Sequence, residues 1–429
     1  MALFKAFTRD NFTRLVALVR REGWRAGIAK LRLYFSKRQH PQPNRDEAYL
    51  DMFWQDMARR DSFHISQPPA YLTGTRRIAM IGDLFLPQCR KYRVEQPAEL
   101  WGGMGVEYGF AHYGDVSRAI ALLQDATHLM FYRTQNDPRM GMYLYEARRL
   151  RLPVAYDLDD PLFSVSAYET YENMKALPAS MKAHFLSEAP KYLGAMNQAD
   201  LITVSTPGMA EHTRALTARP VSFRRNFADA ETLAAATAAL SHVPQTRRQG
   251  AFRVAFASGS QGHEIDFALI GQDIADFLAA DATRQLVILG HFNETLLPEE
   301  LSGRVEWHPF TTYERYLETL ASVDCAVMPL TDDIFNRCKS AVRVIDAAAV
   351  AVPSLVGQIS DMAQVVRDSE TGHVLGADDS WRAALEDLAA DPGATAAMGQ
   401  AARRDLLANW VAQPGLPVIE PDLVSWVKG

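Results

Sequence analysis

The sequence predicts an α/β protein with two domains, each built on a parallel β-sheet. Short apolar runs, which are typical of buried strands, alternate along the chain with amphipathic segments long enough to be helices. The chain has 429 residues, too many for one ordinary hydrophobic core. Because 48% of these residues are hydrophobic, two well-filled cores are expected and global disorder is not.

The N-terminal segment is strongly basic. Residues 1–40 carry ten Lys or Arg and only two acids, Asp10 and Glu22, so this segment has a charge of +8 and the remainder a charge of −14. Apolar residues recur there every three to four positions, which indicates helices. Two interpretations stay open. Residues 1–38 bind an anionic membrane surface as an interfacial helix, or they pack on their own domain with the basic face in solvent. No nucleic-acid partner is expected, because no basic and aromatic platform follows.

The chain lacks the patterns of a secreted or membrane-spanning protein. Near the N-terminus the longest apolar run is Leu15–Val19, which is too short for a signal core or a spanning helix. The cysteines, Cys89, Cys325 and Cys338, are odd in number and lack the spacing of metal ligands or of a disulfide framework. We therefore expect reduced thiols in a cytoplasmic protein, which is peripheral on the inner face of the membrane if the basic segment binds lipid.

The first α/β domain is expected over residues 71–240, after an extension and connector over residues 1–70. The apolar run Ile78–Ile81 is followed by Gly-Asp and predicts a buried strand that leads into a loop. The polar residues 241–250 separate this domain from the next. Further strands are expected at His128–Tyr132, Val154–Tyr156 and Leu201–Val204, with helices at Val116–Gln124 and Met140–Leu150.

The second α/β domain is expected over residues 250–409, followed by a C-terminal tail, residues 410–429, that packs back on the first domain. It shows the same alternation of short apolar runs and amphipathic segments. Strands are expected at Phe252–Ala257, Gln285–Leu289, Arg304–Trp307, Cys325–Met328 and Ser354–Val356, and helices at Asp266–Ala279, Tyr313–Leu320, Lys339–Val350, Trp381–Ala390 and Ala394–Asn409.

Two loops after strands of the second domain carry candidate site residues, because parallel sheets bind ligands at the carboxyl ends of their strands. The glycines and hydroxyls of Ser258–His263 would let backbone N–H groups approach an anion, although a tight turn explains the same residues. Pro329–Ser340 leads into a helix with Lys339 and Ser340 in its first turn. A lysine there opposes the helix dipole unless an anion such as diphosphate binds; the alternative is a surface lysine.

Two further side chains on that helix extend the candidate site. Arg343 lies one turn after Lys339 and would face the same anion. Asp346 shares a helical face with Arg343. Its carboxylate either accepts hydrogen bonds from ribose hydroxyls or forms a salt bridge with Arg343, and both interpretations stay open.

The first domain places acids and bases after its own strands. Asp157, Asp159 and Asp160 are so close that they must be solvated, paired or liganded, and they could recognise a hydroxyl or act as a base. Arg93 and Arg133 follow two other strands and lie either on a phosphate or in solvated basic loops. A hydrolase or a kinase has little support, because no Ser-His-Asp order, zinc spacing or P-loop occurs.

Several of these pieces together resemble glycosyltransferase family 4 and the related group 1 glycosyl transferases. The resemblance covers residues 77–405 and rests on the order and spacing of the pieces. They are Phe256–Ser260 with His263 and Asp266–Phe267, then Ala326–Leu330, Phe335–Asn336 with Lys339–Ser340, Asp346–Ala349 with Pro353, and Thr371–Leu375, and in the first domain Tyr92–Val94, Phe131–Arg133 and Tyr156–Asp160.

This resemblance implies the GT-B fold, in which two Rossmann-like domains with parallel sheets face each other across a cleft. It also implies a retaining glycosyltransferase that moves a sugar from a nucleotide-sugar donor to a glycan or lipid-linked acceptor, in surface polysaccharide or glycoconjugate biosynthesis. No metal and no cofactor beyond the donor substrate are required, since helix dipoles and cations stabilise the diphosphate leaving group.

The resemblance also implies a role for each candidate residue. Donor binding is expected of Gly259, Ser260, His263, Asn336, Lys339, Ser340, Arg343 and Asp346, with Asp346 on the ribose; catalysis is expected of Asp159, Asp160 and Lys339; and contact with the acceptor or a phosphate is expected of Arg93 and Arg133.

The sequence departs from the family pattern at several positions. Cys338 stands where the first acid of a paired motif is usual, Asp346 replaces the second Glu, and Ala351 replaces the usual Gly before a proline. Two alternatives to an active transferase therefore stay open. One is a non-catalytic GT-B scaffold that binds a glycan or protein partner, and the other is a nucleotide-sugar epimerase that needs no acceptor.

Overall fold

The computed structural model describes most of the chain after residue 73. The described residues are 74–246, 250–259, 263–294, 297, 301, 303–412 and 417–429, with the separate positions 16, 19, 20, 24 and 28. Residues 1–60 and 61–429 form two compact units. In the first unit the described residues are helical. The rest of the predicted N-terminal extension and connector lies outside the described residues, and so does Ser260.

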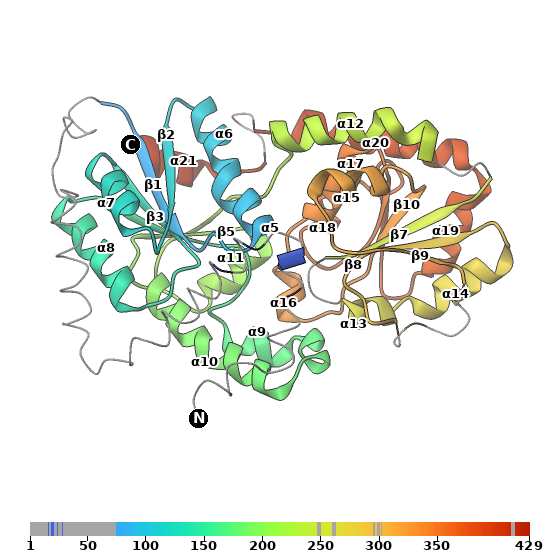
Figure 1. The fold of residues 1–429 in the computed structure, drawn as a ribbon, viewed down its shortest axis with the longest axis horizontal. Coiled ribbons are helices and arrows are strands. Elements are labelled where there is room, and N and C mark those ends of the chain that lie inside the picture. Colours follow the sequence, from blue (N-terminus) through green and yellow to red (C-terminus); the bar gives the residue numbers. More distant parts are fainter. Residues whose placement is uncertain are drawn as a thin grey trace. The chain divides into compact units, whose positions relative to one another are not determined.

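The first sheet has six parallel strands in the order β2-β1-β3-β4-β5-β6. Its central strands are β3 (His128–Tyr132) and β4 (Val154–Leu158), in which every residue is buried. Such continuous buried strands are typical of parallel sheets with helices on both faces, and helices flank this sheet in Figure 1. The other strands are β1 (Arg77–Gly82), β2 (Glu107–His112), β5 (Leu201–Val204) and β6 (Val221–Phe223).

The helices around this sheet start where side chains cap their first turns. Asp137 accepts a hydrogen bond from the backbone N–H of Met140 at the start of α8 (Pro138–Arg149), and Thr206 caps α11 (Pro207–Arg214) in the same way. A proline follows each cap, where its missing N–H is harmless. The other helical elements are α5 (Pro87–Cys89), the π-helix η1 (Arg90–Glu95), α6 (Gln96–Gly103), α7 (Val116–Gln124), α9 (Val165–Thr170), the 3₁₀ helix η2 (Glu172–Ala176) and α10 (Ala179–Met196). The next helix, α12 (Ala230–Thr246), packs against helices of the second α/β region (Figure 1).

The second sheet also has six parallel strands, in the order β12-β11-β10-β7-β8-β9. The predicted fold class, α/β with two parallel sheets, is therefore confirmed. The strands are β7 (Arg253–Gly259), β8 (Gln285–Gly290), β9 (Val305–His308), β10 (Cys325–Met328), β11 (Ser354–Gly357) and β12 (Gly372–Leu375). The helices around this sheet are α13 (Glu264–Ala268), α14 (Gly271–Ala280), α15 (Tyr313–Leu320), α16 (Ile334–Arg337), α17 (Val342–Ala349), α18 (Met362–Val365), α19 (Trp381–Ala390) and α20 (Pro392–Asn409). The last helix, α21 (Pro421–Lys428), lies against the first sheet.

The structure corrects the predicted position of Lys339 and Ser340. The expected helix over Lys339–Val350 begins later than predicted, because α17 starts only at Val342, and the short helix α16 before it ends at Arg337. Lys339 and Ser340 therefore lie between two helices rather than in a helical first turn. This placement removes the conflict between the lysine charge and a helix dipole, and it leaves the Lys339 carbonyl free to accept a hydrogen bond from the backbone of Asp361.

Two other predicted segments differ as well. The helix expected over Asp266–Ala279 is two helices, α13 and α14, separated at Ile270. The basic segment after β1 is the π-helix η1, in which Lys91, Tyr92, Arg93 and Val94 are buried. Its interpretation as a solvated basic loop is therefore wrong. π-Helices are rare and occur often near functional sites.

The last described residues contact the first sheet. The backbone N–H of Arg225 donates to the carbonyl of Val418 at 2.7 Å, and the Ser222 hydroxyl donates to the Glu420 carboxylate, also at 2.7 Å. The ring of Trp426 in α21 lies 4.9 Å from the ring of His128. These contacts join residues 417–429 to β6 and β3.

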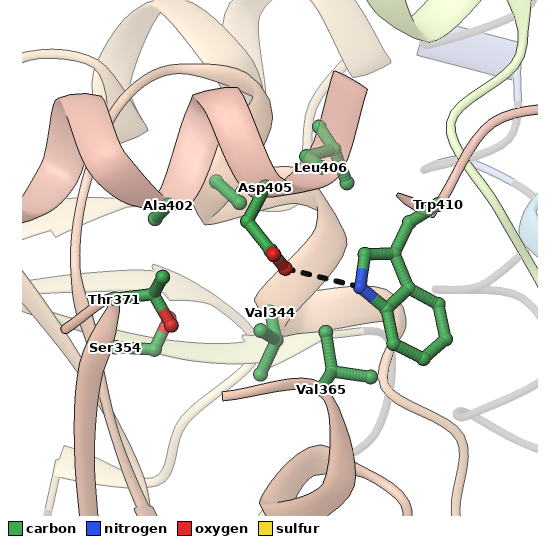
Figure 2. A pocket seen from close by; sticks show the side chains of 9 residues that line it. Val344, Ser354, Val365, Thr371, Ala402, Asp405, Leu406 and Trp410 are labelled. Carbon is green, nitrogen blue, oxygen red and sulfur yellow. Dashed lines mark hydrogen bonds between the residues drawn. The ribbon is translucent and has the colours of Figure 1, made fainter. Parts of the chain in front are cut away.

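A cavity in the second α/β region, drawn in Figure 2, has a volume of about 10 Å³, space for about one water molecule. Asp405 and Trp410 line it, and the Trp410 indole N–H donates to the Asp405 carboxylate at 3.3 Å. Because a sugar or a nucleotide is far larger than this volume, the cavity is a packing feature and not a substrate site.

Candidate active site

Charged side chains gather at the carboxyl ends of both sheets, where α/β proteins bind ligands. We define the first-sheet cluster as Arg93, Arg133, Asp157, Asp159 and Asp160, and the second-sheet cluster as His263, Asp266, Asn336, Lys339 and Arg343. Both sets contain residues that the sequence singles out, but the two clusters differ in how their charges are partnered.

In the first-sheet cluster, Arg93 and Asp157 form an ion pair with both side chains 0% exposed. The guanidinium donates from Nε to Oδ1 at 2.9 Å and from Nη2 to Oδ2 at 2.6 Å. It also donates to the carbonyl of Arg224 and to Asn226, and the Thr203 hydroxyl donates to Asp157 at 2.6 Å. A buried ion pair this well supplied with hydrogen bonds holds η1 against β4.

Arg133 bridges the other two carboxylates of the first-sheet cluster. Its Nε donates to Asp159 at 2.5 Å and its Nη2 donates to Asp160 at 2.7 Å. The backbone of Arg133 has a φ of 50°, a left-handed conformation that costs a non-glycine residue about 1–3 kcal/mol. That strain turns the guanidinium toward both acids, and the Tyr132 hydroxyl adds a hydrogen bond to Asp159 at 3.1 Å.

The two carboxylates beside Arg133 have opposite pKa shifts. Burial raises the pKa of Asp159, but the charge of Arg133 and the hydrogen bond that Arg133 donates lower it by more, so the pKa lies below the usual value. Burial and the neighbouring charge of Asp159 raise the pKa of Asp160, although Arg133 and Lys339 both act to lower it. Asp160 is therefore the member of this pair that takes up a proton more readily.

In the second-sheet cluster, Lys339 is partly exposed and has no ion pair with a carboxylate among the described residues. Its Nζ donates to the Tyr171 hydroxyl at 3.2 Å and lies 5.3 Å from the centre of that ring. Burial lowers the pKa of Lys339 to about 8, with Asp266 opposing and Arg343 adding to this shift. The ammonium thus contacts the neutral Tyr171 hydroxyl directly, while the carboxylates of Asp266, Asp160 and Asp333 act on its pKa from beyond ion-pair distance.

His263 and Asp266 form the polar centre of this cluster. His263 Nδ1 lies 2.8 Å from the carboxylate of Asp266, and burial followed by the charge of Lys339 lowers the pKa of His263 to about 3. The imidazole is therefore neutral, and because a carboxylate only accepts, Nδ1 carries the proton. The approach of Lys339 Nζ to the same nitrogen at 3.4 Å is then a contact and not a second hydrogen bond.

Asp266 is fully buried and gathers donors from several elements. It accepts hydrogen bonds from the backbone N–H of Thr331 at 2.9 Å and from the side-chain amides of Asn336 and Asn173 at 3.2 and 2.8 Å. Burial raises the pKa of Asp266, but the His263 hydrogen bond and Lys339 lower it below the usual value. Asp266 is therefore ionised and fixes the orientation of the side chains around it.

A segment of the first α/β region reaches this cluster. Tyr171 precedes η2 and stacks on Phe335 of α16, with ring centroids 4.3 Å apart and planes 11° apart. Asn173, in η2, bonds to Asp266 as described. Sequence reasoning did not identify either residue, because nothing in the local pattern of residues 165–176 indicates a contact with residues 90 or more positions away.

The remaining donor candidates have well-defined positions. Arg343 donates to the carbonyl of Ala257 at 3.4 Å, and no ion pair joins it to Asp346 among the described residues. Asp346 instead accepts hydrogen bonds from the hydroxyls of Tyr313 at 2.6 Å and Tyr92 at 3.2 Å. Burial raises its pKa to about 7. The salt-bridge interpretation of Asp346 is therefore wrong, and its contact with a ribose stays a prediction.

Gly259 and Ser340 complete the described candidates. Gly259 ends β7 with a φ of 76° and open space where a Cβ would be, so the left-handed conformation favours glycine there. Gly290 beside it has a φ of 102°, and a Cβ there would lie 2.4 Å from the Gly259 carbonyl oxygen. Ser340 accepts a hydrogen bond from the side chain of Asn226 at 3.2 Å. Among the described residues no group of His, Cys, Asp and Glu is placed to hold a metal ion.

Comparison with solved structures identifies the fold. The chain is similar to a glycosyltransferase from Rickettsia africae, with a TM-score of 0.53 and 9% sequence identity over 79% of this chain and 95% of that one. It is also similar to HepE from Anabaena in complex with UDP and glucose, with a TM-score of 0.50 and 12% identity over 79% and 96% of the two chains. No protein-family model and no curated protein matches the sequence. The chain has the GT-B fold, with two Rossmann-like domains.

Proposed function

We propose that this protein is a glycosyltransferase that moves a sugar from a nucleotide-sugar donor to a glycan or lipid-linked acceptor. The observation that carries this proposal is the pair of cations, Lys339 and Arg343, at the carboxyl end of the second sheet without a carboxylate partner among the described residues. A diphosphate is the ligand that two such cations accommodate best. The similar fold of HepE, solved with UDP-glucose at a TM-score of 0.50, supports the same choice of donor.

The proposed reaction uses both clusters. The acceptor hydroxyl oxygen forms a bond to the anomeric carbon on the same face from which the bond to the diphosphate oxygen breaks, so that the configuration at that carbon is kept. The leaving diphosphate takes the electron pair, and Lys339 and Arg343 stabilise its charge. Asp160, with its raised pKa, takes the proton of the acceptor hydroxyl. The sugar keeps its anomeric configuration, and no metal takes part.

Other candidates support these steps. Gly259 and Ser260 offer backbone N–H groups to the diphosphate, His263, Asn336 and Ser340 line the donor, and Asp346 binds the ribose once its tyrosine partners release it. Asp159 holds Arg133 in place beside the acceptor. Arg93 does not touch the acceptor but fixes η1 against β4 through its buried ion pair with Asp157.

Nucleotide binding tests the proposal. Thermal unfolding of the wild type is measured with millimolar UDP, ADP, GDP, CDP and dTDP, and at least one should raise the midpoint. The K339A variant should lose that shift because the anion loses its cation, whereas K175A, at an exposed lysine of the neighbouring η2, should keep it. Absence of a shift with every nucleotide in the wild type contradicts the proposal.

A second candidate function is a non-catalytic scaffold that binds a glycan or a protein partner. Position 338 is a buried cysteine and so has no carboxylate. The carboxylate of Asp346 accepts hydrogen bonds from two tyrosines, so neither position offers a free carboxylate to a donor in this structure. The two functions differ in turnover. Release of nucleoside diphosphate from a nucleotide sugar, faster with a glycan acceptor than without one, rules out the scaffold.

Attachment to an anionic membrane through residues 1–38 is part of the proposed function. The described part of the chain contains no helix that is long and apolar enough to cross a membrane. The charge of +8 on residues 1–40 supports a peripheral contact with anionic lipid instead. The full chain should co-sediment with phosphatidylserine vesicles at low salt and dissociate at high salt, and a variant lacking residues 1–38 should not. Equal sedimentation of both contradicts this contact.

A further inference from the structure

Asn173 is held at the second-sheet cluster in one defined orientation. Its side-chain nitrogen donates to the Asp266 carboxylate at 2.8 Å and to the Tyr171 hydroxyl at 3.1 Å. Because an ionised carboxylate can only accept, the nitrogen of the amide must face Asp266 and the carbonyl oxygen must face away from it. The residue is 6% exposed, so its environment and not solvent fixes this orientation.

The carbonyl oxygen of Asn173 is buried and has no hydrogen-bond partner among the described residues. An unsatisfied buried acceptor destabilises the folded protein, and native structures rarely keep one without a ligand or an ordered water. Asn336, which donates to the same carboxylate, also has an unpartnered buried carbonyl oxygen. The cluster around Asp266 therefore holds two buried amide oxygens that have no hydrogen-bond donor among the described residues.

The groups next to Asn173 limit what can satisfy its oxygen. Lys339 donates to the Tyr171 hydroxyl, the same hydroxyl to which Asn173 donates. Under the proposed function Lys339 is the cation that binds the diphosphate. A phosphate or carboxylate oxygen cannot donate to an amide oxygen, so the missing partner is a hydroxyl or an N–H. In a nucleotide sugar both the ribose and the transferred sugar carry hydroxyls next to the diphosphate. Because the proposed function places the ribose at Asp346, the transferred sugar is the part that remains for Asn173.

We propose that the side-chain carbonyl of Asn173, supplied by the first α/β region, accepts a hydrogen bond from a hydroxyl of the transferred sugar. The inference rests on the proposed function and adds a sugar-reading residue to it. Asp266 acts as the positioning residue that turns the amide, and Tyr171 supports the same orientation. The donor is then a sugar with a free hydroxyl at the position that faces η2.

The test separates recognition of the sugar from recognition of the nucleotide. Dissociation constants are measured by calorimetry for UDP, ADP, GDP, CDP and dTDP and for the glucose conjugate of each, with the wild type and N173A. For the nucleotide that binds, N173A should weaken the glucose conjugate by about three- to tenfold, the range of one neutral hydrogen bond. The constant for the free nucleoside diphosphate should stay within twofold. E172Q, one residue away on the surface, serves as the matched control and should match the wild type for both ligands.

Deoxy analogues of the bound glucose conjugate locate the hydroxyl. The analogue that lacks the recognised hydroxyl should bind the wild type as weakly as the parent conjugate binds N173A, and N173A should not distinguish the two. An equal loss for nucleotide and conjugate, or no loss for either, overturns the inference while leaving the proposed function intact. If the wild type binds none of these nucleotides, the proposed function fails, and the inference fails too because it rests on that function. Thermal unfolding of N173A shows whether the variant is folded.

Discussion

In the first-sheet cluster every guanidinium faces a carboxylate, whereas in the second-sheet cluster Lys339 and Arg343 face neutral oxygens. Arg93 and Arg133 share three acids, at N–O distances of 2.5–2.9 Å. Lys339 donates to a tyrosine hydroxyl and Arg343 to a backbone carbonyl. The single acid of the second cluster, Asp266, is occupied by His263 and by amide and backbone donors.

This difference separates a charge cluster that stabilises the fold from one that is prepared for a ligand. A buried guanidinium with a bidentate carboxylate has its charge compensated from within the protein. The partly buried ammonium of Lys339 has no carboxylate within ion-pair distance among the described residues, and burial lowers its pKa. Removing a cation should therefore have opposite consequences for stability in the two clusters.

The largest expected effect is on the first-sheet cluster. In R93M the carboxylate of Asp157 stays buried without its partner, so the free energy of unfolding should fall by about 3–5 kcal/mol. Urea unfolding followed by circular dichroism measures it. R93M/D157L, which replaces both charges by apolar groups, should recover part of the loss. An R93M midpoint equal to that of the wild type would show that this ion pair does not stabilise the fold.

The next effect distinguishes the clusters most sharply. K339M removes a cation that has no carboxylate partner, so its urea midpoint should equal or exceed that of the wild type. Its affinity for the nucleoside diphosphate that the wild type binds should fall about 100-fold, because the charge-assisted contacts to the anion are lost. K175M, at an exposed lysine, should change neither quantity. A destabilised K339M with unchanged nucleotide affinity would make Lys339 a structural residue.

The strands show what the sequence reveals about the fold. β3, β5 and β10 were predicted to the residue, because each is mainly apolar and buried along its whole length. The three strands that were missed, β2, β6 and β12, all lie at the edges of their sheets. β2, for example, has an exposed residue and several half-buried ones. Edge strands mix polar and apolar residues, so their pattern is weak.

The site shows where local sequence ceases to be informative. Lys339 was singled out because a lysine in a helical first turn opposes the helix dipole, but the structure places Lys339 between α16 and α17, so the premise of that argument was wrong. Tyr171 could not, since it lies 168 positions from Lys339 and only the fold joins them. Asp346 was recognised as a candidate, but its partners Tyr92 and Tyr313 lie 254 and 33 positions away, so its tyrosine environment was not predictable.

A smaller effect concerns pH and sharpens the contrast at Lys339. The folded-state pKa of about 8 means that this ammonium is protonated at pH 7 and mostly neutral at pH 9. The affinity for nucleoside diphosphate, which stays ionised over this range, should therefore fall by roughly tenfold between the two pH values. Calorimetry in buffers of different ionisation enthalpy should also show proton uptake near pH 8. K339R, whose guanidinium keeps its proton, should lose this dependence, and a wild-type affinity that is constant from pH 7 to 9 contradicts the assignment.

The smallest effect concerns Asp346, which belongs to neither cluster and is held by two tyrosines. Its pKa of about 7 in the folded protein exceeds the usual aspartate value of 3.8, so between these pH values the folded state keeps a proton that the unfolded state releases. By linkage, the contribution of Asp346 to stability falls as the pH rises from about 4 through 7 and then stays constant. D346N stays neutral throughout, so its thermal midpoint relative to the wild type should rise by a few degrees between pH 5 and pH 8. A pH-independent difference would mean that Tyr313 and Tyr92 keep the carboxylate ionised, and a charged Asp346 would then face the nucleotide from the start rather than after release from its tyrosines.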